Sequence, residues 1–156
     1  MSIEKQEEIK QRSYAEAMRY MSNAKETLQK ARKMDNYYAD SKYVRTACGT
    51  AYNGVLLALD TYLELKGVEM PQKKRRSIAF YTSNIAKLDG KLLVRLETVY
   101  SVLHLDGYYD GSRDAIVVKR GFDNAYDIID RIKPNQVIEL PPAKHPILRR
   151  IVSYFF

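Results

Sequence analysis

A histidine beside tyrosines and carboxylates is the feature of this sequence best suited to chemistry. His104 is followed by Asp106, Tyr108, Tyr109 and Asp110. Carboxylates and phenols can hydrogen-bond an imidazole and fix its orientation, which would suit a binding site. His104 also stands near the end of an expected helix, where a cation interacts favourably with the last carbonyl groups. The sequence leaves both interpretations open.

Two polar residues interrupt an otherwise apolar helical stretch. Asn53 and Asp60 are seven residues apart and therefore share one face of a helix. Buried polar groups need hydrogen-bond partners. Tyrosines across the core would provide them in one interpretation, and a ligand-binding cleft would in the other. With His104, Tyr108 and Tyr109, these two residues make up the candidate ligand-binding set.

A run of four cations is the candidate contact for nucleic acid. Lys73, Lys74, Arg75 and Arg76 follow one another in a connection between expected helices. The net charge of the chain is +7, but its other cations are dispersed. A run of this kind is usually a solvated surface, and the alternative is a contact with phosphates.

Motifs for other chemistries do not occur in the sequence. It contains no GxxxxGK, GxGxxG, CxxC or HExxH motif, so nucleotide-fold, zinc-ribbon and zincin interpretations have no support. We therefore predict no catalytic residue, no metal site and no cofactor. Cys48 is the single cysteine, which excludes an internal disulfide, and its apolar surroundings predict a small buried side chain.

The elements that must position these residues are helices. Apolar residues from Tyr14 to Ala31 recur at steps of three and four, and large side chains alternate with alanines, so a neighbouring helix can approach closely. We expect a capping box of Ser13 and Glu16 to begin this helix, with residues 3–12 frayed. Glu16 lies off the apolar seam and is expected to be exposed.

A second helix is expected from about Asp40 to Lys66, with Gly67 ending it in the left-handed conformation. Two apolar stripes place this helix at the centre of the bundle. Gly49 and Gly54 within it indicate close approach of a neighbouring helix.

Three more helices follow, and turn residues separate them. We expect the third to have Pro71 in its first turn, the fourth to run from about Lys91 to Leu105, and the segment Gly107–Gly111 to form a turn. The fifth helix should start after Ser112 as its N-cap and stop before Pro134. Short connections imply antiparallel neighbours.

The fold class predicted from these patterns is all-α, an up-and-down bundle of four or five helices in one domain, residues 1–133. Residues 134–156 form an irregular tail that is partly extended, with one apolar face if residues 147–156 are helical. The composition, 46% hydrophobic and 29% charged, is typical of a globular protein. No apolar run is long enough to span a membrane, and the polar N-terminus favours a cytoplasmic location.

The chain resembles a small family of uncharacterised helical-bundle proteins, mostly from Bacteroidetes. The resemblance lies in the segments YYADSKYVRTAC, AYNGVLLALDTYLELKG, LHLDGYYDG and GFDNAYDII. That family is similar to HEPN domains, which accompany nucleotidyltransferases and include RNA-cleaving toxins. The resemblance implies a HEPN-like bundle over about residues 12–133. HEPN ribonucleases carry an arginine about four to six residues before a histidine, and neither His104 nor His145 has one. The resemblance therefore transfers no catalytic residue.

We predict a non-catalytic, HEPN-like interaction module that acts as a homodimer and could also bind another protein. A dimer is expected because the apolar face of the tail and the two-stripe helix offer more apolar surface than a small bundle buries. The alternative is a nucleotide- or RNA-binding protein that uses the run of cations and the residues around His104.

Overall fold

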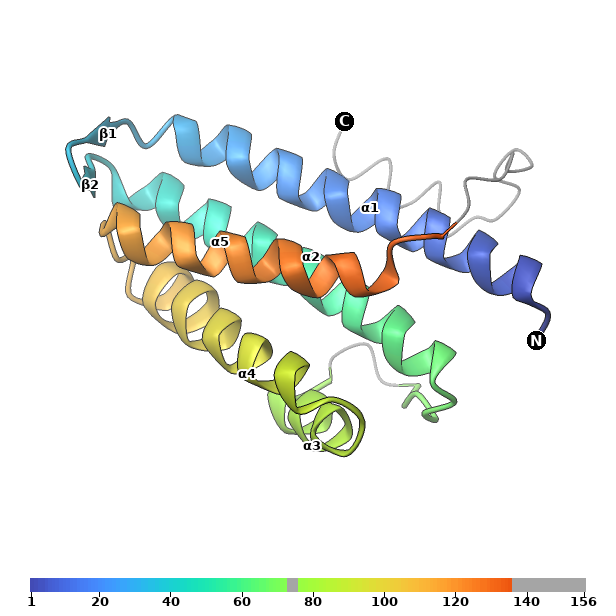
Figure 1. The fold of residues 1–156 in the computed structure, drawn as a ribbon. Coiled ribbons are helices and arrows are strands. Elements are labelled where there is room, and N and C mark those ends of the chain that lie inside the picture. Colours follow the sequence, from blue (N-terminus) through green and yellow to red (C-terminus); the bar gives the residue numbers. More distant parts are fainter. Residues whose placement is uncertain (73–75, 136–156) are drawn as a thin grey trace.

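The computed structural model describes residues 1–72 and 76–135 (Figure 1). These residues form an all-α fold with one small hairpin. The expected helix at 147–156 lies outside the described residues, as do Lys73, Lys74 and Arg75. Within the described residues, no helix combines the length and apolar content needed to cross a bilayer.

Helices α1 (Ile3–Gln29) and α2 (Ser41–Leu65) lie side by side and antiparallel (Figure 1). Ser2 caps α1 by accepting a hydrogen bond from the amide of Lys5, so the expected start at Ser13 is wrong. Ser13 instead accepts a hydrogen bond from Thr61 of α2 at 2.8 Å. Glu16, expected to be exposed, is buried. The helix begins before Ser13 because the cap at Ser2 stabilises its first turn even though residues 3–12 have no continuous apolar face.

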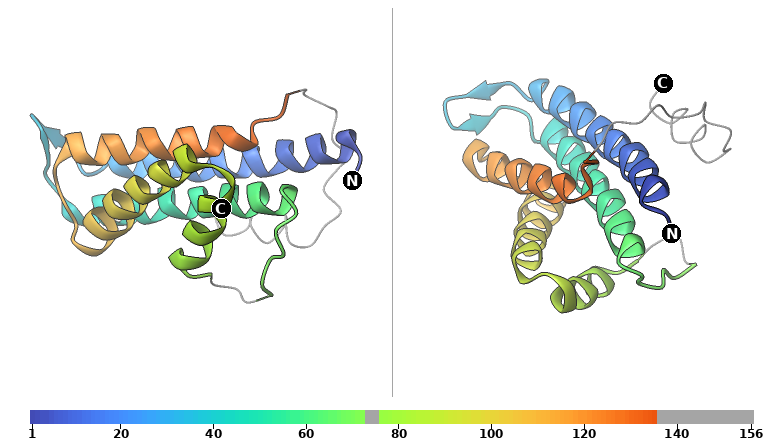
Figure 2. Two further views of the ribbon diagram at one scale, coloured as in Figure 1. Left: turned by 60° about the horizontal axis from the view of Figure 1, so that its bottom comes forward. Right: turned by 45° about the vertical axis from the view of Figure 1, so that its right-hand side comes forward.

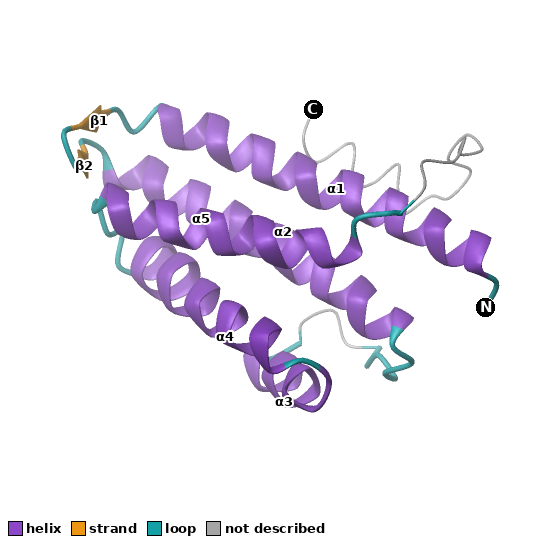
Figure 3. Ribbon diagram, in the orientation of Figure 1, coloured by secondary structure: helices purple, strands orange, loops and turns teal. Residues whose placement is uncertain are grey.

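A two-stranded hairpin joins α1 to α2 (Figure 3). Strands β1 (Lys33–Met34) and β2 (Tyr37–Tyr38) are antiparallel, and Lys33 pairs with Tyr38. Asp35, with a positive φ of 55°, lies in the turn between the two strands. The strands are only two residues long, so no alternating pattern could reveal them.

The second half of the chain contains α3 (Ile78–Leu88), α4 (Gly90–Val99), the π-helix η1 (Tyr100–Tyr109), α5 (Ala115–Ile129) and the short 3₁₀ helix η2 (Asp130–Ile132). Helices α3 and α4 meet at a sharp bend (Figure 2). Asp89 forms this bend, since it ends α3 and its carboxylate caps α4.

Three expected boundaries in this half are wrong. Ser77 caps α3, so Pro71 lies before the helix. Asp114 caps α5 by accepting from two amide groups, and this carboxylate takes the place expected for Ser112. The segment expected to turn at Gly107 continues as a π-helix to Tyr109.

Helix α2 is central and packs against α1, α5 and η1 (Figure 2). Most residues of its two expected apolar stripes are buried, whereas Leu56, Tyr62 and Leu65 are half-buried. The expected apolar seam is confirmed at Ala17, Met21 and Ala24 of α1 and at Ala31 just beyond it, which are fully buried. The close approach expected at Gly54 is also confirmed. A Cβ atom there would lie 2.9 Å from Cβ of Tyr20 on α1.

Candidate functional site

The π-helix η1 lies very close to α2 and α5 because glycines stand at the contacts. A Cβ atom on Gly107 would lie 2.5 Å from Sγ of Cys48 on α2, and one on Gly121 of α5 would lie 2.6 Å from Cδ2 of Leu103. Cys48 is buried, as expected, and burial raises the pKa of its thiol to about 12. Cys48 is therefore a neutral part of the core. Long π-helical segments are rare and often coincide with functional sites.

Five rings from α2 and η1 gather beside this contact, and we call them the aromatic cluster: Tyr52, Tyr100, His104, Tyr108 and Tyr109. The imidazole of His104 stacks on Tyr52 and Tyr100, with ring centroids 4.6 Å and 5.2 Å apart. Tyr108 lies parallel to His104 at 6.0 Å, and Tyr109 meets it edge-on at 5.0 Å. The spacing of four residues between Tyr100, His104 and Tyr108 aligns these rings along one side of η1.

The position of His104 differs from the expected helix end. The helix continues five residues further, so His104 lies in its middle and has no role at the last carbonyl groups. Burial lowers the pKa of His104, because desolvation disfavours the charged imidazolium. Within residues 1–72 and 76–135, no carboxylate hydrogen-bonds His104. The ring therefore acts as a neutral stacking partner at neutral pH.

The outer rings of the aromatic cluster face solvent. Tyr109 is 59% exposed and Tyr108 46%, whereas Tyr52 at the base is only 7% exposed. Gly49 of α2 lies directly beneath Tyr108, and a Cβ atom there would be 2.9 Å from the Tyr108 ring. Close approach of the two helices thus supports an exposed aromatic surface.

Arg45 is the residue at this site whose role the sequence did not indicate. It lies one to two turns before Tyr52 on α2, and its guanidinium donates to the carbonyl oxygens of Tyr108 and Tyr109. Gly111, with a φ of 64°, lets the chain pass against this guanidinium. The sequence does show that carbonyl groups at the end of a helix could bind a cation. It does not show that Arg45 is that cation, because Arg45 and Tyr108 are more than sixty residues apart in the chain.

Asp60 belongs to a different cluster. One of its carboxylate oxygens accepts a hydrogen bond from the hydroxyl of Tyr81 at 2.8 Å, and the other pairs with Arg76 at 3.0 Å. Burial is the largest influence on the pKa of Asp60 and raises it. Of the two interpretations of this residue, hydrogen bonding to a tyrosine across the core is the one observed. Asn53 is exposed, so the expectation that it is buried is wrong.

The residues proposed from sequence thus separate into two places. His104, Tyr108 and Tyr109 lie together, while Asp60 and Arg76 form their own ion pair. Arg95, the nearest arginine upstream of His104, bonds Asp127 and Asn124 of α5. In the part of the chain that the structure describes, no group of three or more histidine, cysteine or carboxylate side chains is arranged to hold a metal ion.

Two comparisons with known proteins give matches, and both matches carry a description of unknown function. The family model described as Domain of unknown function (DUF5618) matches residues 12–134. A solved structure, described as a protein of unknown function from Dyadobacter fermentans, is 44% identical. The similarity covers 79% of this chain and 94% of that one, with a TM-score of 0.70. No curated protein matches the chain significantly.

Proposed function

The chain belongs to the DUF5618 family, and we propose that it is a non-catalytic, HEPN-like interaction module that acts as a homodimer through its aromatic cluster. The observation that carries this proposal is the exposure of Tyr108 and Tyr109 above stacked rings that hold them in place. Ring contacts support the exposed tyrosines, and within the described residues no carboxylate hydrogen-bonds His104 to assist it as an acid or base.

Exposed tyrosines on a fixed support are typical of protein interfaces. A tyrosine offers a large apolar ring with a polar tip and loses little conformational entropy on binding, which is why interfaces are enriched in it. Here Arg45 fixes the backbone at Tyr108 and Tyr109, and His104 packs against both rings. The surface is therefore ordered before any partner arrives, and this lowers the cost of association.

A second copy of the chain is the partner that the charges around the aromatic cluster favour. Symmetric dimers place the same surface of both subunits in contact, so the surface must be complementary to itself. Arg45 borders the cluster on one side, Asp106 lies on η1 between His104 and Tyr108, and Asp110 directly follows η1. A twofold axis through the tyrosines can bring opposite charges together.

The dimer proposal now depends on the aromatic cluster. Most of the apolar residues of α2 are buried in the bundle, and the half-buried Leu56 and Tyr62 pack against its core, so α2 leaves little apolar surface for a partner. The tail, the other expected contributor, lies outside the described residues.

Light scattering coupled to size-exclusion chromatography tests the dimer. We expect the mass of two chains at tens of micromolar, and the mass of one chain for Tyr109→Asp, because a charge would be buried in the contact. Val94→Asp is the matched control, since Val94 is equally exposed, at 62%, but lies on α4. A monomeric parent protein, or a dimer that Tyr109→Asp leaves intact, would contradict the proposal.

The non-catalytic part of the proposal has a separate test. Incubation of the protein with a mixed-sequence RNA should give no cleavage, because general acid–base cleavage needs a free cation beside the histidine to stabilise a phosphorane. Arg45 is engaged by the carbonyl oxygens of Tyr108 and Tyr109, and Arg95 is bound to α5. Cleavage by the parent protein that disappears in His104→Ala would refute this part.

The alternative of RNA binding through the run of cations has less support. Arg76 is engaged by Asp60 and by the carbonyl oxygen of Pro71, so its charge serves the fold. Binding to RNA that weakens steeply with salt and is lost when Lys73, Lys74 and Arg75 are all replaced by glutamine would favour this alternative.

A further inference from the structure

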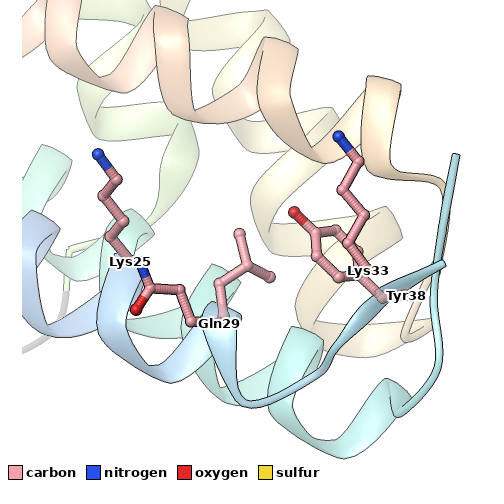
Figure 4. A pocket seen from close by; sticks show the side chains of 5 residues that line it. Lys25, Gln29, Lys33 and Tyr38 are labelled. Carbon is pink, nitrogen blue, oxygen red and sulfur yellow. The ribbon is translucent and has the colours of Figure 1, made fainter. Parts of the chain in front are cut away.

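A pocket lies at the C-terminal end of α1, where the chain enters the hairpin. Its volume is about 320 Å³, and it is lined by Lys25, Leu28 and Gln29 of α1, Lys33 of β1 and Tyr38 of β2 (Figure 4). This volume is near the lower end of the roughly 300–1,000 Å³ that ligand pockets occupy. The pocket is thus of a size for a small molecule.

The backbone around the pocket is held in place before any ligand binds. Lys33 and Tyr38 are directly paired across the hairpin. The amide of Ala39 donates to the carbonyl oxygens of Ala31 and Arg32, and the amide of Tyr38 donates to the carbonyl oxygen of Arg113 ahead of α5. Arg32 has a φ of 53°, a left-handed conformation that is unfavourable for arginine and that turns the chain from α1 into β1.

The lining of the pocket combines an apolar body with cationic ends. Leu28 and Tyr38 are half-buried and pack against the hydrophobic core. Lys25 and Lys33 extend to the same side of the ribbon, and the hydroxyl of Tyr38 lies between them in the view of Figure 4. Within residues 1–72 and 76–135, neither lysine has an ion-pair partner. Burial raises the pKa of Tyr38, so its hydroxyl remains a proton donor.

We propose that this pocket binds a small aromatic anion, a phosphate monoester or carboxylate, with its ring against Leu28 and Tyr38 and its charge between the amino groups of Lys25 and Lys33. The donors fit an anion because ammonium groups and a phenol supply hydrogen bonds without competing negative charge. The amide of Gln29 adds a further donor. Lys25 and Gln29 are one turn apart on α1 and therefore face the same ligand.

Isothermal titration calorimetry of the full chain with phenyl phosphate tests the site, with benzoate and inorganic phosphate titrated in parallel. We expect phenyl phosphate to bind and the double variant Lys25→Gln/Lys33→Gln to weaken binding by about tenfold or more, since each lysine supplies a charge-assisted hydrogen bond. Lys30→Gln is the matched control, because Lys30 is an exposed cation at the end of the same helix outside the pocket. It should leave the affinity within about twofold.

The remaining probes decide the chemistry of the ligand. Benzoate that binds more tightly than phenyl phosphate assigns a carboxylate, and the reverse order assigns a phosphate; either supports the proposal. Inorganic phosphate that binds as tightly as phenyl phosphate would overturn it, because the apolar wall would then contribute nothing. No binding of either aromatic anion at millimolar concentration, or equal loss in Lys30→Gln, would overturn it as well. So would binding of a single-stranded RNA that phenyl phosphate does not displace, since that result would indicate a surface for nucleic acid.

Discussion

Two clusters on α2 contain tyrosines and a titratable residue, yet they are built in opposite ways. Asp60, Arg76 and Tyr81 form a closed cluster in which hydrogen bonds and an ion pair satisfy the carboxylate. The aromatic cluster around His104 is open, since its members contact one another mainly through ring faces and edges. At 1.5 Å per residue, Tyr52 and Asp60 are only about 12 Å apart along the helix.

The difference indicates which polar residues serve the fold and which serve a surface. A carboxylate brought into a half-buried place needs donors, and Asp60 obtains them from two residues of the following segment. A neutral imidazole carries no charge that needs a counter-ion, and His104 is only half-buried, so its neighbours remain free to face solvent. The polar side-chain contacts of the closed cluster should therefore stabilise the fold, and the exposed rings of the open cluster should control association.

A substitution that forces η1 away from α2 would separate the rings of the aromatic cluster, and we expect it to have the largest effect on stability. In Gly107→Ala, the added Cβ atom would meet Cβ and Sγ of the buried Cys48, both on a stiff side chain. We expect the free energy of unfolding to fall by about 2 to 3 kcal/mol. Urea denaturation measures this change.

Gly90→Ala is the matched control for that substitution. A Cβ atom added at Gly90 would meet no neighbouring atom within 4 Å, and Gly90 begins α4, so alanine should be neutral or stabilise by up to about 1 kcal/mol. Equal stability of Gly107→Ala and the parent protein would show that η1 does not approach α2 as closely as described.

Removing the carboxylate should open the closed cluster. Asp60→Ala leaves Arg76 and Tyr81 without their partner, and we expect the free energy of unfolding to fall by about 1 to 3 kcal/mol. This is less than for a fully buried ion pair, because the side chains of Asp60 and Arg76 are partly exposed. Asp123→Ala serves as the control: its ion pair with Lys119 is exposed and should be worth less than about 0.5 kcal/mol. A dimer mass altered by Asp60→Ala would contradict the division between the two clusters.

A single hydroxyl distinguishes the clusters more finely. Tyr81→Phe removes the donor to Asp60 and should cost about 1 to 2 kcal/mol, because the half-buried oxygen loses a partner. Tyr109→Phe keeps the ring and deletes an exposed hydroxyl, so it should change the free energy of unfolding by no more than about 0.5 kcal/mol. If thermal denaturation shows the two variants to be equal, the hydrogen bond to Asp60 contributes nothing.

The smallest effect concerns pH. Because the pKa of His104 in the folded state lies below its ordinary value of 6.5, the stability it contributes is fully present above that value and is lost as the pH falls below it. The urea midpoint of the parent protein should therefore fall more between pH 8 and 5.5 than that of His104→Phe. The difference between the two proteins isolates His104 from carboxylates that titrate in the same range. A steeper fall in the variant would reverse the sign we infer.

The sequence by itself determined that the fold is helical, where α2 begins and ends, and which residues form most of the interior. The limits of α2, from the Asp40 cap to the left-handed Gly67, and the buried seam of α1 follow from capping and periodicity, which depend on neighbours within a few residues. The residues through which α1 and α2 pack against each other could be predicted for the same reason. Of the candidate site, His104, Tyr108 and Tyr109 were proposed together because they are adjacent in sequence.

Only the tertiary structure decided what those residues face. The π-helix runs through a segment whose glycines predict a turn, because Gly107 is used for close contact with Cys48. Arg45 reaches carbonyl groups more than sixty residues away, and the partners of Asp60 lie 16 and 21 residues further along the chain. Such pairings depend on how whole helices pack against one another, a choice that local sequence preference does not encode.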